Sequence, residues 1–134
     1  MIYATSVTEP PQELLENLSE MSAEGGDKLL DGFIKQSFDN LYIKDEDKPL
    51  ILIGAIKWGN FSPEADIWFY TSKFFSVKHA RTARAMWLTW ARLQKETLTA
   101  HCKCSKSRRF LEFNDFKFRE VHNGIYTYEA QKWA

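Results

Sequence analysis

The chain has 134 residues, of which 44% are hydrophobic and 15% aromatic, enough apolar material for one folded domain over residues 1–134. No stretch approaches the roughly 18 apolar residues that a membrane span needs, and the longest apolar run is Pro49–Ile56. The first residues lack a basic region followed by an apolar one, so we expect no secretory signal. Cys102 and Cys104 are too close in sequence to pair comfortably on an extended chain, which favours a reducing cytoplasm.

The net charge of zero conceals a division between two halves of the sequence. Residues 1–72 contain 5 Lys and Arg against 13 Asp and Glu, and residues 73–134 contain 13 against 5, so the halves carry −8 and +8. The stretch Lys73–Arg109 alone carries +9. Either the halves neutralise each other or the basic half faces an anionic ligand.

A short strand over residues 1–8 is predicted to open the chain. Pro10 and Pro11 favour the first turn of a helix, where a missing N–H costs nothing. Apolar residues then recur at helical spacing until a glycine pair ends the helix: Leu14, Leu15, Leu18, Met21 and Gly25–Gly26. Asp27 is predicted to cap a second helix that ends near Asp39–Asn40, with one apolar face: Leu29, Leu30, Phe33 and Ile34.

Three strands are predicted next, over residues 41–44, 49–58 and 65–71. The second is nearly all apolar, which indicates a central strand covered on both faces. The longest helix is predicted over Val77–Glu96. Its buried arc is Ala80, Ala83, Met86, Trp87, Trp90, Ala91 and Leu93, and its exposed side is Lys78, Arg81, Thr82, Thr89 and Arg92.

The last part of the chain is predicted to form a strand over residues 97–103, a short helix capped by Ser105 or Ser107, and two strands. These strands cover residues 116–121 and 125–133 and are joined at Asn123–Gly124, a favourable turn pair. The element order is therefore β-α-α-β-β-β-α-β-α-β-β. This order predicts an α/β (α+β) fold with a mixed, mostly antiparallel sheet and helices on both faces.

This order resembles the fold of the GCN5-related N-acetyltransferase (GNAT) family over essentially the whole chain. The segment from Trp68 to Phe118 resembles the half of that family that binds acetyl-coenzyme A. Residues Ser107–Phe116 resemble the small helix that ends in a Gly-Phe pair before the next strand. A narrower resemblance, carried by Trp68–Ser72, a basic helix and Arg109–Leu111, is to the acetyltransferase-like internal virion proteins of short-tailed coliphages.

The resemblance implies that acetyl-coenzyme A lies with its pyrophosphate at the start of the long helix, on backbone N–H groups. Its pantetheine arm would lie along the backbone of Phe69, Tyr70 and Thr71. The family pattern at the helix is Arg or Gln, two residues, Gly, one residue, then Gly or Ala. The matching positions are Lys78, Arg81, Thr82 and Ala83, with Arg81 in place of the first Gly. Because its side chain can fill the volume that the pyrophosphate needs, we expect impaired cofactor binding, although a guanidinium also pairs well with phosphate.

The catalytic residues of the family are not found at the matching positions. Asp115 stands where the Gly of the Gly-Phe pair would be, and Leu111 stands where many members carry a Tyr that protonates the leaving thiolate. Cys104 replaces the family Asn that begins this helix, and a thiol lacks the donors of an amide. Asp66 is the only acid on the predicted central strands. The catalytic residues therefore stay unassigned.

Other reactive side chains have structural interpretations beside the functional ones. His101 is either a base or a hydrogen-bonded structural histidine. One strand cannot wrap His101, Cys102 and Cys104 around a metal ion, so we expect no metal site. Cys104 as a nucleophile would need a base and an oxyanion site. Tyr126 and Tyr128 could reach a site, but aromatic residues on strands usually pack.

Three functional hypotheses follow. The first is a catalytically impaired, acetyltransferase-like phage protein in the host cytoplasm or the virion, with a phage or host protein as partner. The second is an active acetyl-coenzyme A-dependent N-acetyltransferase, whose early helices favour a cationic amine through Glu16, Glu20, Glu24, Asp27 and Asp31. The third is nucleic-acid binding through residues 73–109, which we disfavour because Trp87 and Trp90 lie on the buried arc and cannot stack on bases.

Overall fold

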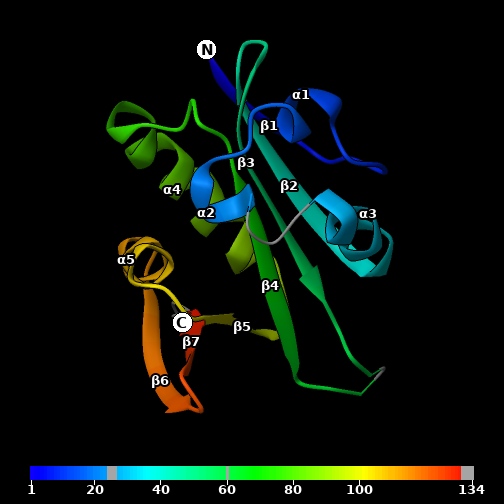
Figure 1. Ribbon diagram of the computed structural model, residues 1–134. Helices are drawn as coiled ribbons and strands as arrows, with labels where there is room; N and C mark the ends of the chain where they lie inside the picture. The colour runs from blue at the N-terminus through cyan, green and yellow to red at the C-terminus, as the bar shows by residue number, and fades with distance from the viewer. Residues whose placement is uncertain (24–26, 60, 131–134) are drawn as a thin grey trace.

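The computed structural model describes residues 1–23, 27–59 and 61–130, and within them it shows one seven-stranded sheet with helices on both faces (Figure 1). The strand order is β1-β2-β3-β4-β5-β7-β6, and neighbours are antiparallel except for the parallel pair β4–β5. The predicted fold class is confirmed. The strands are β1 (Ile2–Thr5), β2 (Ser37–Asp45), β3 (Lys48–Ile56), β4 (Glu64–Thr71), β5 (Thr97–Cys102), β6 (Phe116–His122) and β7 (Ile125–Ala130).

The helices divide between the two faces of the sheet. They are α1 (Gln12–Leu15), α2 (Glu20–Ala23), α3 (Asp27–Gln36), α4 (Val77–Arg92) and α5 (Ser105–Phe113). Leu14 of α1 and Leu30 of α3 pack in one apolar cluster with Leu52 of β3. Trp87 of α4 and Leu111 of α5 pack in the other, so β3 is covered on both faces, as predicted.

The predicted first helix is wrong as a single element. It is two single-turn helices, α1 and α2, because Leu18 between them forms an isolated antiparallel bridge with Ser72 after β4. Two hydrogen bonds interrupt the helix. The side chain of Asn17 donates from Nδ2 to the carbonyl of Glu13 at 2.8 Å, and the backbone N–H of Ser19 donates to the carbonyl of Thr71 instead of to the preceding turn. The predicted glycine stop at residues 25–26 lies outside the described residues.

Three helix boundaries differ from the prediction: the ends of α3 and α4 and the start of α5. Helix α3 ends at Gln36, because Ser37 already pairs with Ile56 of β3. Leu93 is the C-cap of α4 and is 77% exposed, so its predicted place on the buried arc is wrong. Trp87 and Trp90 are buried as predicted. The N-cap of α5 is Cys104, not Ser105 or Ser107.

Gly54 of β3 is required by the close packing of β4. It pairs with Trp68, and a Cβ at Gly54 would lie 2.2 Å from Cζ2 of the indole. The indole stacks on Phe33 of α3 at a centroid distance of 5.8 Å and donates to Ser37 Oγ at 2.7 Å. The absent side chain therefore lets a large ring lie flat between the sheet and α3.

The position of the candidate site follows from the way β4 and β5 part. Their parallel ladder runs from Glu64–Thr97 to Ile67–Ala100 and, among the described residues, ends there. Strand β4 continues to Thr71, still paired with β3. The strands that carry Trp68 and Leu98 are thus adjacent and parallel, as predicted, and beyond Ile67 one edge of β4 is left without β5.

Candidate functional site

A cavity of about 720 Å³ opens where β4 and β5 part. One wall is mainly aromatic and apolar and comes from α3, β3 and β4: Phe33, Ile56, Trp68 and Tyr70. The opposite wall is polar and comes from β5 and the start of α5: His101, Lys103, Cys104 and Ser107. Asp66 and Trp58 lie at one end. The cavity is large enough for a small ligand or a side chain of a partner.

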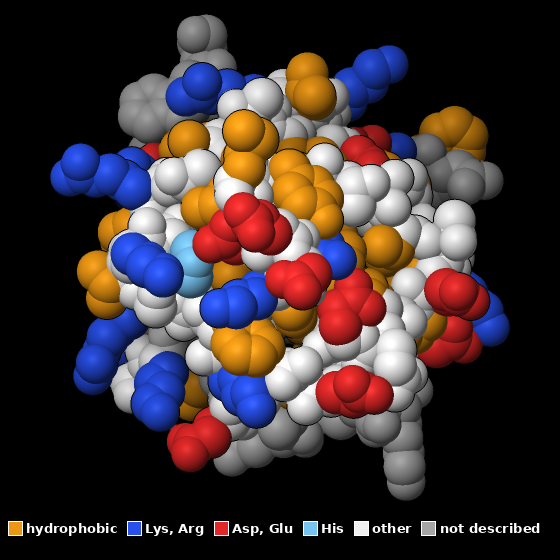
Figure 2. Space-filling model, turned by 90° about the horizontal axis from the view of Figure 1, so that it is seen from above, with side chains coloured by type: hydrophobic (Ala, Val, Ile, Leu, Met, Phe, Trp, Pro, Cys, Tyr) orange, Lys and Arg blue, Asp and Glu red, His pale blue; other side chains and the backbone are white. Residues whose placement is uncertain are grey.

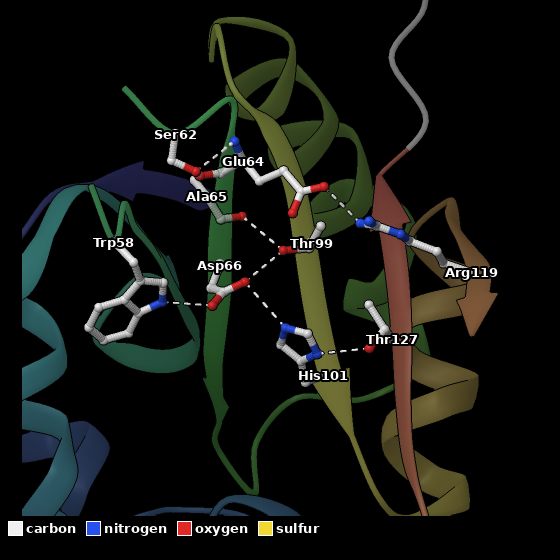
Figure 3. A network of polar contacts seen from close by, with 9 residues as sticks. All are labelled: Trp58, Ser62, Glu64, Ala65, Asp66, Thr99, His101, Arg119 and Thr127. Carbon is white, nitrogen blue, oxygen red and sulfur yellow. Dashed lines mark hydrogen bonds and ion pairs between the residues drawn. The ribbon is translucent and has the colours of Figure 1, made fainter. Parts of the chain in front are cut away.

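Asp66 is the centre of a polar network in this cavity (Figure 3). Its Oδ2 accepts from Trp58 Nε1 at 2.7 Å, and its Oδ1 accepts from Thr99 Oγ1 at 2.7 Å and lies 3.2 Å from His101 Nε2. On the other side of the imidazole, Nδ1 lies 2.9 Å from Thr127 Oγ1. The structure thus joins Asp66 and His101, two residues that sequence analysis did not pair.

This network already uses both ring nitrogens of His101. When His101 donates from Nε2 to Asp66, its Nδ1 accepts the Thr127 hydroxyl. Asp66 accepts from three donors, which leaves about one of its four lone-pair positions for a ligand. A general base needs a free lone pair within reach of the proton that it removes. In this arrangement the pair serves to fix Trp58 and Thr99.

The two cysteines differ in their surroundings. Cys104 is exposed, and its Sγ lies 3.1 Å from Ser107 Oγ and accepts the N–H of Ser107 at 3.4 Å. Hydrogen bonds from the hydroxyl and the N–H of Ser107 lower the pKa of the Cys104 thiol. Burial raises the pKa of the Cys102 thiol. Of the two, Cys104 is the more reactive thiol on the cavity wall.

The positions that resemble the family's thiolate-protonating helix have core roles. Leu111 is 1% exposed and packs in the core cluster with Trp87, so it presents nothing to the cavity. Asp115 has φ of 64°, the left-handed conformation that favours glycine, in keeping with its match to the family Gly. Its carboxylate accepts from Arg84 Nη2 at 2.6 Å.

Residues Phe69, Tyr70 and Thr71, predicted to hold the pantetheine arm, lie along the end of β4. Phe69 stacks on Phe110 of α5 at a centroid distance of 4.6 Å, and Tyr70 packs edge-on against Trp68 on the other face. The backbone of Thr71 faces away from β3, toward the side that β5 has left. Its N–H and C=O are therefore the groups that a ligand between the strands would meet.

A segment of the chain itself already occupies these groups. The N–H of Ser19 donates to the C=O of Thr71 at 2.9 Å, the N–H of Thr71 donates to Ser22 Oγ at 2.8 Å, and the N–H of Lys73 donates to the C=O of Asn17 at 2.8 Å. We call Asn17–Ser22 the strap. The strap therefore occupies the outward-facing N–H and C=O of Thr71, and the pantetheine contact with residues 69–71 stays a prediction. Sequence periodicity missed these serines because they were assigned to a helix.

The residues predicted for the pyrophosphate lie on the first two turns of α4, three of them on its exposed side. Lys78, Arg81 and Thr82 are exposed on the helix, whereas Ala83 is 5% exposed in the core. The start of α4 is closed by His79, whose Nδ1 accepts the N–H of Ser76 at 3.2 Å. That Arg81 blocks the pyrophosphate stays a prediction.

The charge division of the sequence has two outcomes in the structure. Some acids of the first half pair with bases of the second, as in Glu64–Arg119 at 2.8 Å and Asp45–His79 at 3.3 Å. Lys78 and Arg81 pair with no acid in the described part of the chain. Figure 2 shows Lys and Arg gathered on the side where α4 lies in Figure 1, and Asp and Glu across the centre and the opposite side.

A second cavity, of about 400 Å³, lies between the strap, the end of β4 and α5. Its wall carries Lys73 and Lys106 beside Phe75 and Phe110.

Among the described residues no cluster of His, Cys, Asp and Glu could hold a metal ion. Within the same residues no helix is long and apolar enough to cross a membrane.

No protein-family model matches the sequence, and no curated protein matches it. Solved structures do match over nearly the whole length. A protein described as a GNAT-family acetyltransferase of Desulfovibrio desulfuricans superposes with a TM-score of 0.74 at 14% identity, covering 98% of this chain and 99% of its own. The Bacillus subtilis acetyltransferase in complex with CoA gives 0.71 at 10% identity, covering 99% and 100%. An N-acetyltransferase of Campylobacter jejuni in complex with acetyl coenzyme A gives 0.63 at 14%, covering 99% and 100%.

The fold is that of the GNAT acetyltransferases. At these identities the comparison establishes the fold and not the activity. The parting of β4 and β5 and the long helix α4 after β4 thus belong to a GNAT-like architecture. The strap and the Asp66–His101 pair are described from this chain's contacts and do not follow from the fold comparison. The resemblance to phage virion proteins still rests on the sequence segments alone.

Proposed function

We propose that this chain is an acetyltransferase-like protein of a tailed phage that transfers no acetyl group. It acts through a protein partner, either as a virion component or against a host factor in the host cytoplasm. The observation that carries the proposal is the closed network in the cavity, in which Asp66 and His101 satisfy each other. The buried Leu111 supports it, because no proton donor stands there for a leaving thiolate.

Catalysis is tested by incubating the protein with acetyl-coenzyme A and a panel of amines, including polyamines and lysine-containing peptides. Release of the coenzyme thiol is followed with a chromogenic disulfide. We expect no release above the protein-free rate. Release that requires an amine would refute the proposal, and its loss in Asp66→Ala and His101→Ala would assign the activity to this network. Glu64→Ala, an acid two residues earlier on β4, is the matched control.

The phage role has a separate test. Quantitative mass spectrometry of purified particles of a phage that carries this gene should find the chain in fixed proportion to the capsid protein. A chain present only in the lysate, and bound to no phage or host protein after crosslinking in infected cells, would remove the phage part. The fold and the absence of catalysis would be unaffected.

An active acetyl-coenzyme A-dependent N-acetyltransferase is the second candidate. The observation in its favour is the cavity, because it places Asp66 and aromatic side chains such as Trp58 where a cationic amine could lie. Calorimetric titration with acetyl-coenzyme A separates the two candidates. In the second, Arg81→Gly should strengthen binding if Arg81 only obstructs the pyrophosphate, and weaken it if the guanidinium is a ligand.

A further inference from the structure

The strap pairs with β4 as a short extra strand would. The bridge between Leu18 and Ser72 is antiparallel, and the bonds on either side of it use the backbones of Ser19 with Thr71 and of Asn17 with Lys73. These groups lie on the edge that β5 has left. The strap therefore takes the place of an added strand at the end of the cleft.

The strap also stands between the two cavities. Ser22 lines the larger one, which Asp66 and His101 also line. Ser19 and Glu20 line the smaller one, on the side of Lys73. The larger cavity borders β4 from Asp66 to Tyr70, and the smaller one borders the residues that follow, from Thr71 to Lys73. Moving the strap away would join them into one channel along the strand.

Polar contacts hold the strap more than buried apolar surface does. The hydroxyls of Ser19 and Ser22 lie 2.6 and 3.3 Å from Thr71 Oγ1. Glu20 reaches Lys106 at 3.9 Å, but both side chains are largely exposed, so this ion pair contributes little. Helix α1, which precedes the strap, and helix α2, which shares residues 20–22 with it, have four residues each, too few to be stable alone. Local opening of the strap should therefore require much less free energy than unfolding of the sheet.

We infer that the strap is a displaceable internal competitor for the free edge of β4. It opens without unfolding the sheet and then exposes the N–H and C=O of Thr71 to an extended arm that carries amide groups. Lys73 and Lys106 would face an anionic end of that ligand, where Glu20 now lies. The inference rests on the proposed function, because it names the contact that keeps an acetyl donor out.

Hydrogen exchange on the unmodified protein tests the opening. The N–H groups of Ser19, Thr71 and Lys73 depend on the strap, whereas the N–H of Ser72 bonds the carbonyl of Leu50 in β3 at 3.0 Å. We expect the three strap amides to exchange at least about tenfold faster than that of Ser72. Exchange of all four at the rate of global unfolding would overturn the inference.

Calorimetric titration with acetyl-coenzyme A tests the competition. In the double variant Ser19→Ala with Ser22→Ala, we expect binding at least about tenfold tighter than in the unmodified protein, equivalent to ~1.4 kcal/mol. Ser62→Ala is the matched control, since Ser62 Oγ accepts the N–H of Glu64 at the other end of β4 at 3.2 Å. A folded double variant with rapid exchange at Thr71 but no gain in binding would overturn the inference.

The inference and the proposed function fail in different ways. Acetyl transfer by the unmodified protein would end the proposed function. The strap is then judged by adding acetyl-coenzyme A during hydrogen exchange. Loss of protection at Ser19 when the coenzyme binds supports displacement, and unchanged protection at Ser19 and Lys73 overturns it.

Discussion

The two edges of β4 are held in different ways. Toward β3, the register from Ile56–Asp66 to Ile51–Thr71 is continuous, and β3 is buried along nearly its whole length. Toward β5, the ladder ends at Ile67–Ala100, and the cleft and the strap follow. Burying a leucine contributes about 1.5–3 kcal/mol, whereas a hydrogen bond contributes about 1 kcal/mol net. The edge of β4 toward β3 therefore stabilises the fold, whereas the edge toward β5 can bind a ligand or the strap.

The largest difference is expected between two leucines on opposite edges. Leu52 of β3 is 0% exposed, so Leu52→Ala should lower the free energy of unfolding by about 2–5 kcal/mol. Leu18 of the strap is half-buried, and Leu18→Ala should lower it by about 1 kcal/mol. Denaturant unfolding of both variants measures the difference. Equal losses would mean that the strap is as much a part of the core as β3.

A smaller effect is expected at Gly54, on the secure edge. Gly54→Ala would drive a methyl group into the Trp68 indole, and we expect a loss of about 1–3 kcal/mol. Gly32 in α3 is the control, because a Cβ there meets nothing within 4 Å. Gly32→Ala should gain about 0.5–1 kcal/mol from helix propensity. Thermal unfolding followed by circular dichroism measures both, and a neutral Gly54→Ala would show that the indole can move aside.

The contrast between the two edges of β4 also explains which features of the structure could be predicted from the sequence. The run at Pro49–Ile56 predicted the central strand, because burial on both faces leaves a continuous apolar signal. The helical spacing of Ala83, Trp87 and Trp90 likewise predicted the buried arc of α4. Both features depend on local pattern and apolar burial, which periodicity reads directly.

The cleft is built from contacts that periodicity does not read. Leu18 has helical spacing to Leu14, yet its segment pairs with Ser72, 54 residues along the chain. His101 and Asp66 are paired because β5 and β4 are parallel neighbours with a particular register, and no local signal sets that register. The resemblance pointed to the end of β4, where Phe69 and Tyr70 line the cavity, but it did not predict the contacts of Asp66 and His101.

A third test compares two acids on the open side of β4. Asp66→Ala removes the acceptor of Trp58, Thr99 and His101, and Thr99 is buried, so we expect a loss of about 1–2 kcal/mol. Glu64→Ala breaks only its partly exposed pair with Arg119 and should change stability by less than about 0.5 kcal/mol. Urea titration followed by tryptophan fluorescence measures both. Similar losses would mean that the network contributes nothing beyond surface charge.

The smallest effect contrasts two thiols at the end of β5. The pKa of Cys104 is lowered by hydrogen bonds from Ser107, and that of Cys102 is raised by burial. A thiol with a lowered pKa keeps its reactive thiolate as the pH falls, so alkylation of Cys104 should persist to lower pH than that of Cys102. At neutral pH we expect Cys104 to be alkylated faster than Cys102, because it holds the larger thiolate fraction. Peptide mass spectrometry after iodoacetamide pulses between pH 6 and 9 measures both sites.

Ser107→Ala sharpens this last contrast, because it removes the hydroxyl beside Cys104 Sγ and keeps the backbone N–H. The alkylation profile of Cys104 should then move to higher pH, while that of Cys102 stays in place. If the Cys104 profile does not move, the hydroxyl is not what lowers its pKa. If Cys102 reacts first in the unmodified protein, the side of β5 that carries Cys102 is more accessible than the structure shows. The contrast between a buried and an accessible thiol would then be wrong.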